Sequence, residues 1–158
     1  MLFVCTGNIF RSLAADVALS RLLAHRNDVQ VSSAGTDDFP HAVKPRVRDY
    51  LLEKGFDVSG HRRRTVTREL LDESRLVVAM SIDHRTFLKE RFNREAPLFL
   101  EVCGEPAARL PDIEEVVPDW ETDKGAVEAH LRATIDRIVG LAPRIAGNID
   151  ALIERYGR

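Results

Sequence analysis

One stretch at the N-terminus decides the fold, and it reads Met1-Leu2-Phe3-Val4-Cys5-Thr6-Gly7-Asn8-Ile9-Phe10-Arg11-Ser12. A short apolar run ends in a cysteine, a loop with Gly and Asn follows, and a helical pattern begins at Ser12. A strand, a turn and a helix N-terminus in this order form an anion-binding cradle, because the loop N–H groups and the helix dipole point the same way. A cysteine at the floor of that cradle is expected to be held as a thiolate.

Length and composition indicate an ordinary globular protein. At 158 residues the chain is expected to form one domain, over residues 1–158, with a substantial core. The net charge of −2 gives no reason to expect a nucleic-acid partner, and no stretch approaches the ~20 apolar residues of a membrane span. Two cysteines far apart, Cys5 and Cys103, form no disulfide framework and suit the reducing cytoplasm. The apolar run at 1–4 is too short for a signal peptide, so the chain is expected to begin almost directly with its functional loop.

Strands and helices are expected to alternate along the chain. Apolar runs and alternating residues predict strands over residues 1–4, 29–33, 76–80 and 97–100. Apolar periodicity and cap residues predict helices over residues 12–25, 45–55, 67–74, 83–92 and from 125 onward, the last with a kink at Gly140 and Pro143. Residues 102–124 are expected to form a long acidic loop. This order predicts an α/β fold with a mostly parallel sheet, whose ligands bind beyond the carboxyl ends of the strands.

The first loop contains the residue types that covalent cleavage of a phosphate monoester needs. Such cleavage requires an ionised nucleophile, donors for the phosphoryl oxygens and an acid for the leaving group. Cys5 is the candidate nucleophile, and Arg11 can add a bidentate fork to the loop N–H groups. Gly7 and Asn8 tolerate the positive φ that so tight a loop needs. The Ser12 hydroxyl can donate to the thiolate and tune its leaving ability in the second step.

The spacing of Cys5 and Arg11 is not specific by itself, because C-x5-R occurs often by chance and cysteine is among the most buried residue types. The context changes this: Gly-Asn lies inside the loop, a serine follows the arginine, a strand precedes and a helix follows. The loop resembles the signature loop of the low-molecular-weight protein tyrosine phosphatases. The resemblance covers nearly the whole chain and extends through Ser33-Ala34-Gly35-Thr36, Gly55, His61, Ala79-Met80 and Val117-Pro118-Asp119.

This resemblance implies a fold, an activity and a set of site residues. The implied fold is a four-stranded parallel sheet with helices on both faces, a flavodoxin-like three-layer sandwich. The implied activity is hydrolysis of phosphotyrosine and other aryl phosphates through a phosphocysteine, with no metal or organic cofactor. The phosphate would be bound by Thr6, Gly7, Asn8, Ile9, Phe10, Arg11 and Ser12. Ser33 and His61 match residues that hold Asn8 in a strained conformation.

The general acid and the pocket walls are expected from loops further along the chain. The resemblance implies Asp119 as the acid, with Asp112 as the alternative; Asp37-Asp38 is a third candidate, and most surface Asp residues are merely solvated. The family's acid is usually followed by Pro and an aromatic residue, whereas Trp120 and Glu121 follow here. Phe39 and Trp120 are the candidate substrate walls, with core packing as the other reading of each.

Three further positions bear on substrate and redox behaviour. Ile9 is the usual residue of the tyrosine phosphatases, whereas the related bacterial arginine phosphatases carry Thr there. Phe10 replaces a second cysteine that many relatives use in a protective disulfide, so over-oxidation of Cys5 by peroxide is expected. Cys103 is expected to be a buried structural thiol. The basic run Arg62-Arg63-Arg64 is expected to be a solvated face, with recognition of acidic peptides as the minor alternative.

Four functions are therefore open, and a phosphotyrosine phosphatase is favoured. The alternatives are an arsenate reductase, which would need a close cysteine pair; an arginine phosphatase, which Ile9 disfavours; and a non-catalytic anion-binding regulatory module. The expected partner is a phosphotyrosine-containing protein, with neither nucleic acid nor membrane involved, and the protein is expected to be a monomer or weak dimer in the cytoplasm.

Overall fold

The computed structural model describes residues 1–40 and 42–157, so His41 and Arg158 lie outside the description. Its sheet contains three parallel strands, β1 (Leu2–Cys5), β2 (Ser32–Gly35) and β3 (Val77–Ala79), in the order β2-β1-β3. The first strand is central, as its continuous apolar sequence requires, since a strand paired on both edges and covered on both faces has no polar side.

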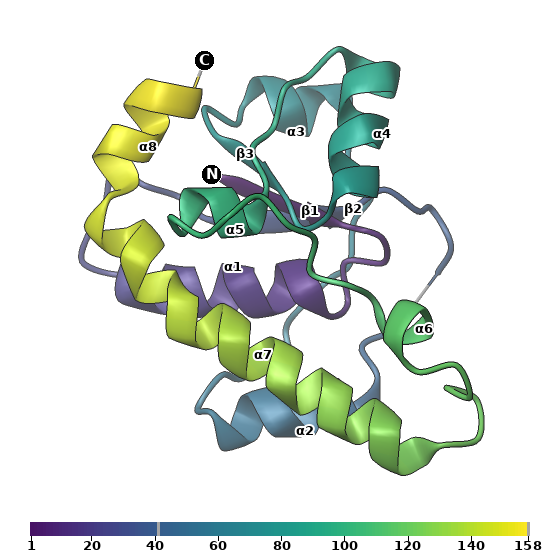
Figure 1. Ribbon diagram of the computed structural model, residues 1–158. Coiled ribbons are helices and arrows are strands. Elements are labelled where there is room, and N and C mark those ends of the chain that lie inside the picture. The colour runs from purple at the N-terminus through teal and green to yellow at the C-terminus, as the bar shows by residue number, and fades with distance from the viewer. Residues whose placement is uncertain (41, 158) are drawn as a thin grey trace.

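Eight helices accompany these strands in the described residues (Figure 1). They are α1 (Arg11–Leu22), α2 (Pro45–Glu53), α3 (Arg68–Asp72), α4 (Ile82–Phe92), α5 (Phe99–Val102), α6 (Ile113–Val116), α7 (Lys124–Gly147) and α8 (Ile149–Tyr156). Local sequence explains several starts: Pro45 provides the first turn of α2, and the side chains of Thr67 and Asp123 cap α3 and α7.

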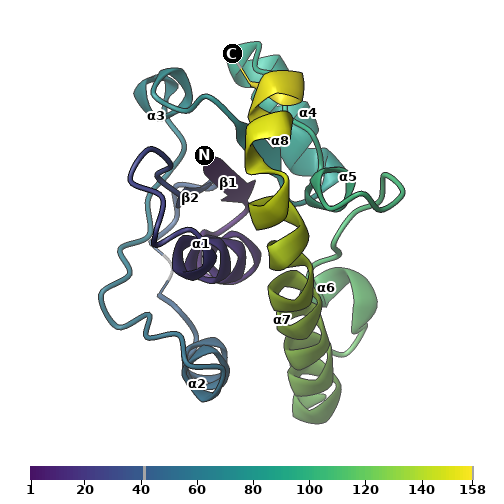
Figure 2. The same cartoon turned by 90° about the vertical axis from the view of Figure 1, so that its left-hand side faces the viewer.

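The side chains of the sheet alternate between two cores. Phe3 and Cys5 belong to the larger core, which α1, α7 and α8 cover, and Leu2 and Val4 belong to the smaller one, beneath α3 and α4. Figure 2 looks along α1 and shows that α1 and α7 lie on the same side of the strands. The predicted class, an α/β three-layer sandwich with a parallel sheet, is confirmed.

The fourth predicted strand, over residues 97–100, is reduced to a single bridged residue, Leu98. Leu98 forms an isolated parallel bridge with Ala79, and α5 begins at the next residue. The reason is local: the Glu101 carboxylate accepts a hydrogen bond from the Leu98 N–H at 2.6 Å, which caps a helical turn where the strand would have continued. Leu98 nevertheless lies beside β3, at the edge of the sheet opposite β2.

Two other boundaries differ from the prediction. The second strand is shifted from residues 29–33 to Ser32–Gly35, so that it ends beside the loop that follows β1. The C-terminal helix passes through Gly140 and Pro143 without interruption, and the break falls at Asn148, between α7 and α8. There the Asn148 side chain donates to the Arg144 carbonyl at 2.9 Å and ends the helix. The acidic loop over 102–124 also contains the short helix α6.

Among the described residues, no helix combines the length and the apolar character that a membrane crossing requires.

Candidate active site

The loop over residues 5–12, which we name the catalytic loop after the role predicted for it, lies at the carboxyl end of β1 and enters the N-terminus of α1. Among the described residues, no side chain caps that N-terminus, and the first turn of α1 holds no acidic residue. Within the same ranges, the backbone N–H groups of residues 7–12 find no hydrogen-bond acceptor in the protein. Unpaired donors at a helix N-terminus attract anions, because the helix dipole adds to their partial charges.

Cys5 is almost fully buried and faces a hydroxyl group. Its Sγ lies 2.9 Å from the Ser12 Oγ, and the Asn8 side-chain amide donates to the same Oγ at 3.2 Å. Because Ser12 can accept from Asn8 and donate its own proton to sulfur, this arrangement stabilises negative charge on Cys5. The predicted role of Ser12 therefore has the required geometry.

Asn8 adopts the left-handed conformation that the sequence predicted for this loop, with φ at +54°. Two residues from the chain after α2 hold it there: His61 Nε2 lies 2.8 Å from the Asn8 carbonyl oxygen, and the Arg64 N–H donates to Asn8 Oδ1 at 3.1 Å. Ser33 acts indirectly, since its carbonyl accepts from Arg64 Nε at 2.9 Å while its hydroxyl donates to Asp16. The strain of a non-glycine residue at positive φ is thus offset by these contacts.

Gly35 permits the closest approach of β2 to the loop. A Cβ atom at this position would stand 2.5 Å from the Thr6 carbonyl oxygen, closer than any side chain allows. The next two backbone N–H groups complete the contact: Thr36 donates to the Cys5 carbonyl at 2.9 Å and Asp37 to the Thr6 carbonyl at 3.1 Å. A glycine is therefore required where the resemblance placed it.

The basic run at 62–64 is only partly a solvated face, which corrects the expectation for it. Arg63 Nε donates to the Gly7 carbonyl at 3.1 Å, and its Nη2 donates to the Asp37 carbonyl. Arg64 braces Asn8 through its backbone N–H, and Arg62 is exposed. Sequence alone did not show this, because a run of charges carries no sign of which members face inward.

Arg11 is 2% exposed, and its guanidinium group contacts both the catalytic loop and the segment that leads into α6. Its Nη1 donates to the Leu110 carbonyl at 2.9 Å, and its Nη2 donates to Thr6 Oγ1 at 3.3 Å and to a carboxylate oxygen of Asp112. Leu110 is itself tied to the sheet, since its N–H donates to the Met80 carbonyl at 3.3 Å. A buried arginine with this orientation can bind two oxygens of one oxyanion.

The two acid candidates lie in different surroundings. Asp112 is half-buried, pairs with Arg11, and caps α6 through its own side chain. Asp119 is exposed in the turn after α6, where its carbonyl accepts from the N–H groups of Thr122 and Asp123. Among the described residues, the Asp119 carboxylate makes no hydrogen bond or ion pair with Cys5 or Arg11. The structure therefore brings Asp112 to the catalytic loop and leaves Asp119 at the surface.

The predicted wall residues are both exposed. Phe39 is 68% exposed and Trp120 is 41% exposed, so neither is a core residue. Phe39 follows the segment that pairs with the catalytic loop, and its N–H donates to Asp37 Oδ1 at 2.7 Å. Ile9 is partly buried in the loop itself, and Phe10 is buried in the larger core.

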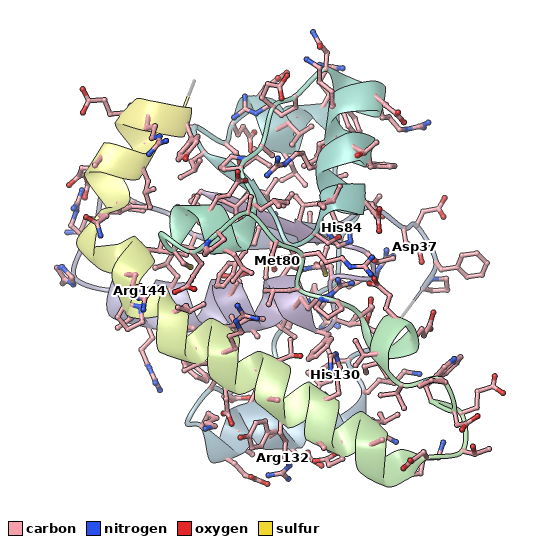
Figure 3. The ribbon with its side chains drawn as sticks, viewed as in Figure 1. Asp37, Met80, His84, His130, Arg132 and Arg144 are labelled. Carbon is pink, nitrogen blue, oxygen red and sulfur yellow. The ribbon has the colours of Figure 1, made fainter. Side chains whose placement is uncertain are left out.

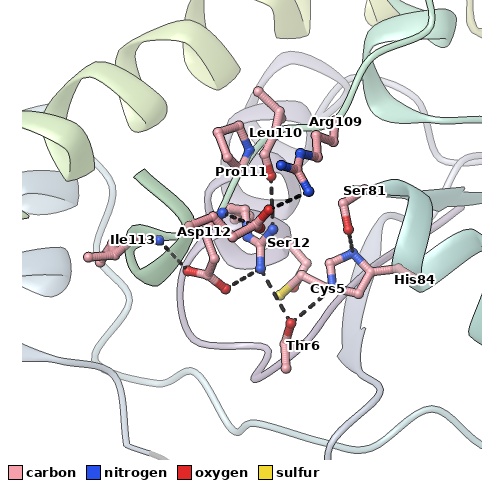
Figure 4. A network of polar contacts seen from close by, with 12 residues as sticks. Cys5, Thr6, Ser12, Ser81, His84, Arg109, Leu110, Pro111, Asp112 and Ile113 are labelled. Atoms are coloured by element: carbon pink, nitrogen blue, oxygen red, sulfur yellow. Dashed lines mark hydrogen bonds and ion pairs between the residues drawn. The ribbon is translucent and has the colours of Figure 1, made fainter. Parts of the chain in front are cut away.

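His84 and Ser81 are polar residues of the site that sequence reasoning missed. Both are buried at the start of α4; His84 Nε2 lies 3.0 Å from Thr6 Oγ1, and His84 Nδ1 lies 2.9 Å from Ser81 Oγ. Figure 3 shows His84 in the interior near Met80, and Figure 4 shows it beside Thr6. Burial, with a smaller contribution from the charge of Arg11, lowers the pKa of His84 to about 3. A lone histidine in a helical pattern gave no sequence signal for this contact.

The arrangement as a whole can hold a tetrahedral oxyanion against a sulfur nucleophile. Free backbone donors and a buried guanidinium surround the floor where Cys5 lies. In the part of the chain that is described, no group of three or more His, Cys, Asp or Glu side chains is placed to hold a metal ion. The groups gathered here are those of nucleophilic catalysis on a phosphoryl centre.

Comparison with known proteins identifies related chains. The family model for the low molecular weight phosphotyrosine protein phosphatases matches residues 1–105. A protein-arginine-phosphatase of Bacillus subtilis (strain 168) is 35% identical over 97 residues, which are 60% of this chain and 63% of that protein. An arsenate reductase of Staphylococcus aureus (strain Newman) is 35% identical over 81 residues, 51% of this chain and 59% of that protein. The chain thus spans about three fifths of the length of these curated relatives.

A solved structure extends the likeness over the full length. The arginine phosphatase YwlE from Geobacillus stearothermophilus superposes with a TM-score of 0.76 at 25% identity, covering 99% of this chain and 96% of that one. The fold is therefore shared with this structure from β1 to α8.

Proposed function

Because the chain belongs to the low molecular weight phosphotyrosine protein phosphatase family, we propose that it is a cysteine-dependent phosphatase of phosphotyrosine and similar aryl phosphates. The observation that carries this proposal is the catalytic loop, where Cys5 faces Ser12 at 2.9 Å beneath unpaired backbone donors and the buried Arg11. The proposed setting is the cytoplasm, and the proposed partner is a phosphotyrosine-containing protein.

The proposed reaction has two steps. In the first, the Cys5 thiolate attacks phosphorus, the bond to the phenolic oxygen breaks, and an acid protonates that oxygen as it leaves. In the second, water attacks the phosphocysteine and gives a proton to the carboxylate that the acid became in the first step. The phosphorus–sulfur bond breaks, and the Ser12 hydroxyl supports the departing thiolate. Arg11 and the loop N–H groups hold the three equatorial oxygens throughout, so they stabilise charge where it develops.

The acid has two candidates, and the contact with Arg11 supports Asp112. A substrate phosphate would take the guanidinium from Asp112 and leave its carboxyl beside the leaving-group oxygen. Asp119 remains the prediction from the resemblance and would have to turn inward from the surface. An acid variant should slow poor leaving groups most, because these depend most on protonation.

Paired variants separate these two candidates. Asp112→Asn and Asp119→Asn are compared over a series of aryl phosphates whose phenols differ in pKa, with the exposed Glu114→Gln of α6 as control. The true acid shows a loss in kcat/KM that grows as the leaving group becomes poorer, and the control shows none. A flat loss in both Asp variants would count against both assignments.

Ile9 supports an aromatic substrate, since an apolar side chain in the loop can pack against a ring and has no hydroxyl to offer a guanidinium. The test compares peptides that carry phosphotyrosine, phosphoserine and phosphoarginine, with Ile9→Thr beside the wild type. Preference for phosphotyrosine, moving toward phosphoarginine in Ile9→Thr, is the expected result. A wild-type preference for phosphoarginine would replace the proposal with the activity named for the Bacillus subtilis relative.

Arsenate reduction is the second candidate, because the Staphylococcus aureus relative bears that name. A disulfide relay needs a second reactive thiol, and the sequence offers only Cys103. Burial raises the pKa of Cys103 to about 12, which makes it a poor relay partner. Arsenate reduction coupled to thioredoxin would overturn the phosphatase proposal, and a lack of such turnover is expected.

A further inference from the structure

A chain of polar contacts runs from the phosphate-binding arginine into the interior. Arg11 Nη2 donates to Thr6 Oγ1. Thr6 Oγ1 contacts His84 Nε2 at 3.0 Å, and His84 Nδ1 contacts Ser81 Oγ at 2.9 Å (Figure 4). Thr6 lies at the mouth of the cradle and is exposed, whereas Arg11, His84 and Ser81 are 2%, 4% and 2% exposed. His84 and Ser81 take no part in the proposed reaction.

The direction of each hydrogen bond follows from Ser81. Its buried hydroxyl proton needs an acceptor, and among the described residues the only hydrogen-bond partner of Ser81 Oγ is His84 Nδ1. Ser81 therefore donates to Nδ1, and the proton of the neutral ring sits on Nε2. A neutral ring is what this site favours, because burial lowers the pKa of His84 to about 3.

The protonated Nε2 then determines what Thr6 can do. His84 Nε2–H and Arg11 Nη2–H both donate to Thr6 Oγ1, so the two lone pairs of that oxygen are used within the protein. The hydroxyl proton of Thr6 is left to point outward, to the side where an anion binds. A threonine held in this way is one more O–H donor for the oxyanion, beside the loop N–H groups.

We propose that His84 is a positioning residue that, with Ser81 behind it, holds Thr6 as a donor to the bound phosphoryl group and as an anchor for Arg11. The contribution is pre-organisation, since the hydroxyl and the guanidinium are already oriented before an anion arrives. This inference rests on the proposed function only in taking the ligand to be a phosphate, and inorganic phosphate serves as the probe.

The first test observes the ring directly. Long-range 1H–15N spectra of protein labelled with 15N-histidine distinguish protonated from unprotonated ring nitrogens, and His84→Gln identifies which of the five histidines is His84. The expected wild-type form at pH 7 is neutral with the proton on Nε2. Ser81→Ala removes the donor to Nδ1, so a shift toward the other tautomer is expected. An imidazolium, or a proton on Nδ1 in the wild type, overturns the proposal.

The second test is a double-mutant cycle between Thr6 and His84. Thr6→Val and His84→Leu are each expected to weaken inorganic phosphate binding, measured by calorimetry, about tenfold. The double variant should bind phosphate no more weakly than either single variant, because both changes remove the same oriented hydroxyl donor at Thr6. Additive losses overturn the proposal. Calorimetry requires no turnover, so a failed phosphatase assay and a failed positioning role give different results.

Rescue and a packing control complete the design. His84→Gln keeps an N–H that can reach Thr6, and it should restore phosphate affinity to within about threefold of wild type. Leu88 lies on α4, like His84, and packs in the smaller core. Leu88→Ala leaves a cavity in that core without changing Thr6 or His84, so it should lower the melting temperature and leave phosphate affinity unchanged. Equal losses of affinity in Leu88→Ala and His84→Leu would show a merely structural effect. If His84→Leu does not fold, the cycle is run with Ser81→Ala, with the same non-additivity expected.

Discussion

The two cysteines are equally buried and share one core, yet only one of them is placed for chemistry. Cys5 and Cys103 are each 3% exposed and both belong to the larger core. Cys5 ends a strand, faces the Ser12 hydroxyl and lies below the N-terminus of α1. Cys103 follows the last turn of α5, where burial raises its pKa to about 12. Equal exposure therefore does not imply equal reactivity, and we expect the polar groups that face each sulfur to make the difference.

The largest expected effect comes from replacing Cys5, the cysteine that we expect to be reactive. Cys5→Ser should lower kcat/KM for an aryl phosphate at least ~10⁴-fold, because a serine hydroxyl is a far weaker nucleophile than a thiolate. Cys103→Ser should keep kcat/KM within about threefold. Steady-state assays of both variants give the answer, and comparable losses in the two would show that the two sulfurs do not differ in reactivity.

Selective modification of the thiols sharpens the same contrast. A pKa of about 12 leaves Cys103 about three orders of magnitude less thiolate at pH 7.5 than an ordinary thiol. Iodoacetamide should therefore label Cys5 first, and peroxide should drive Cys5 to the sulfinic and sulfonic acids, since Phe10 stands where a protective cysteine would be. Peptide mass spectrometry measures both outcomes. A reducible disulfide between Cys5 and Cys103 would contradict the prediction.

The Ser12 hydroxyl is the polar group that distinguishes the two sulfurs most directly. Ser12→Ala should lower kcat about ten- to a hundredfold, because it removes a hydrogen bond to a charged group. Ser20→Ala is the matched control on the same helix, where the exposed hydroxyl donates to Asp16 at 3.1 Å. Rapid-quench detection of the phosphocysteine should show its accumulation in Ser12→Ala and not in the control.

The smallest expected effect concerns stability in acid, because the loop that holds Cys5 contacts a buried histidine, His84, through Thr6. The folded-state pKa of His84 is about 3, below its ordinary value of 6.5, so the unfolded chain binds the extra proton between these pH values. Stability from this group is complete above pH 6.5 and decreases as the pH falls toward 3. At pH 5 the loss is about 2 kcal/mol.

Urea denaturation at pH 7 and pH 5 measures this loss in the wild type and in His84→Gln, which has no group to titrate there. The wild type should lose about 2 kcal/mol more free energy of unfolding than the variant over this interval. Equal losses would show that His84 carries its proton in the folded protein.

The place of the catalytic loop between a strand and a helix, and the left-handed conformation of Asn8, could be predicted from sequence, because both depend on consecutive residues. The α/β class followed equally well from the apolar run of β1 and from the helical pattern that begins after the loop. The strand expected at 97–100 failed, since a side chain three residues on, Glu101, caps a helix there instead. A pattern of apolar residues does not register such a local competitor.

What could not be predicted depends on contacts between distant segments. His84 and Thr6 are 78 positions apart, and Arg63 reaches Gly7 from 56 positions away. The choice between Asp112 and Asp119 is of the same kind, because both follow prolines in one acidic stretch and only the path of the chain brings one of them to Arg11.

The ion pair of Arg11 with Asp112 also bears on inhibitor design. A carboxylate tethered to the chain competes with any free anion at an effective concentration in the millimolar range. Simple carboxylates compete with the Asp112 carboxylate for the Arg11 guanidinium, so they should inhibit poorly. Dianions such as phosphonates carry more charge and more oxygens than the tethered group. A ligand that replaces Asp112 at the guanidinium and also fills the backbone donors would gain contacts that the internal carboxylate does not make.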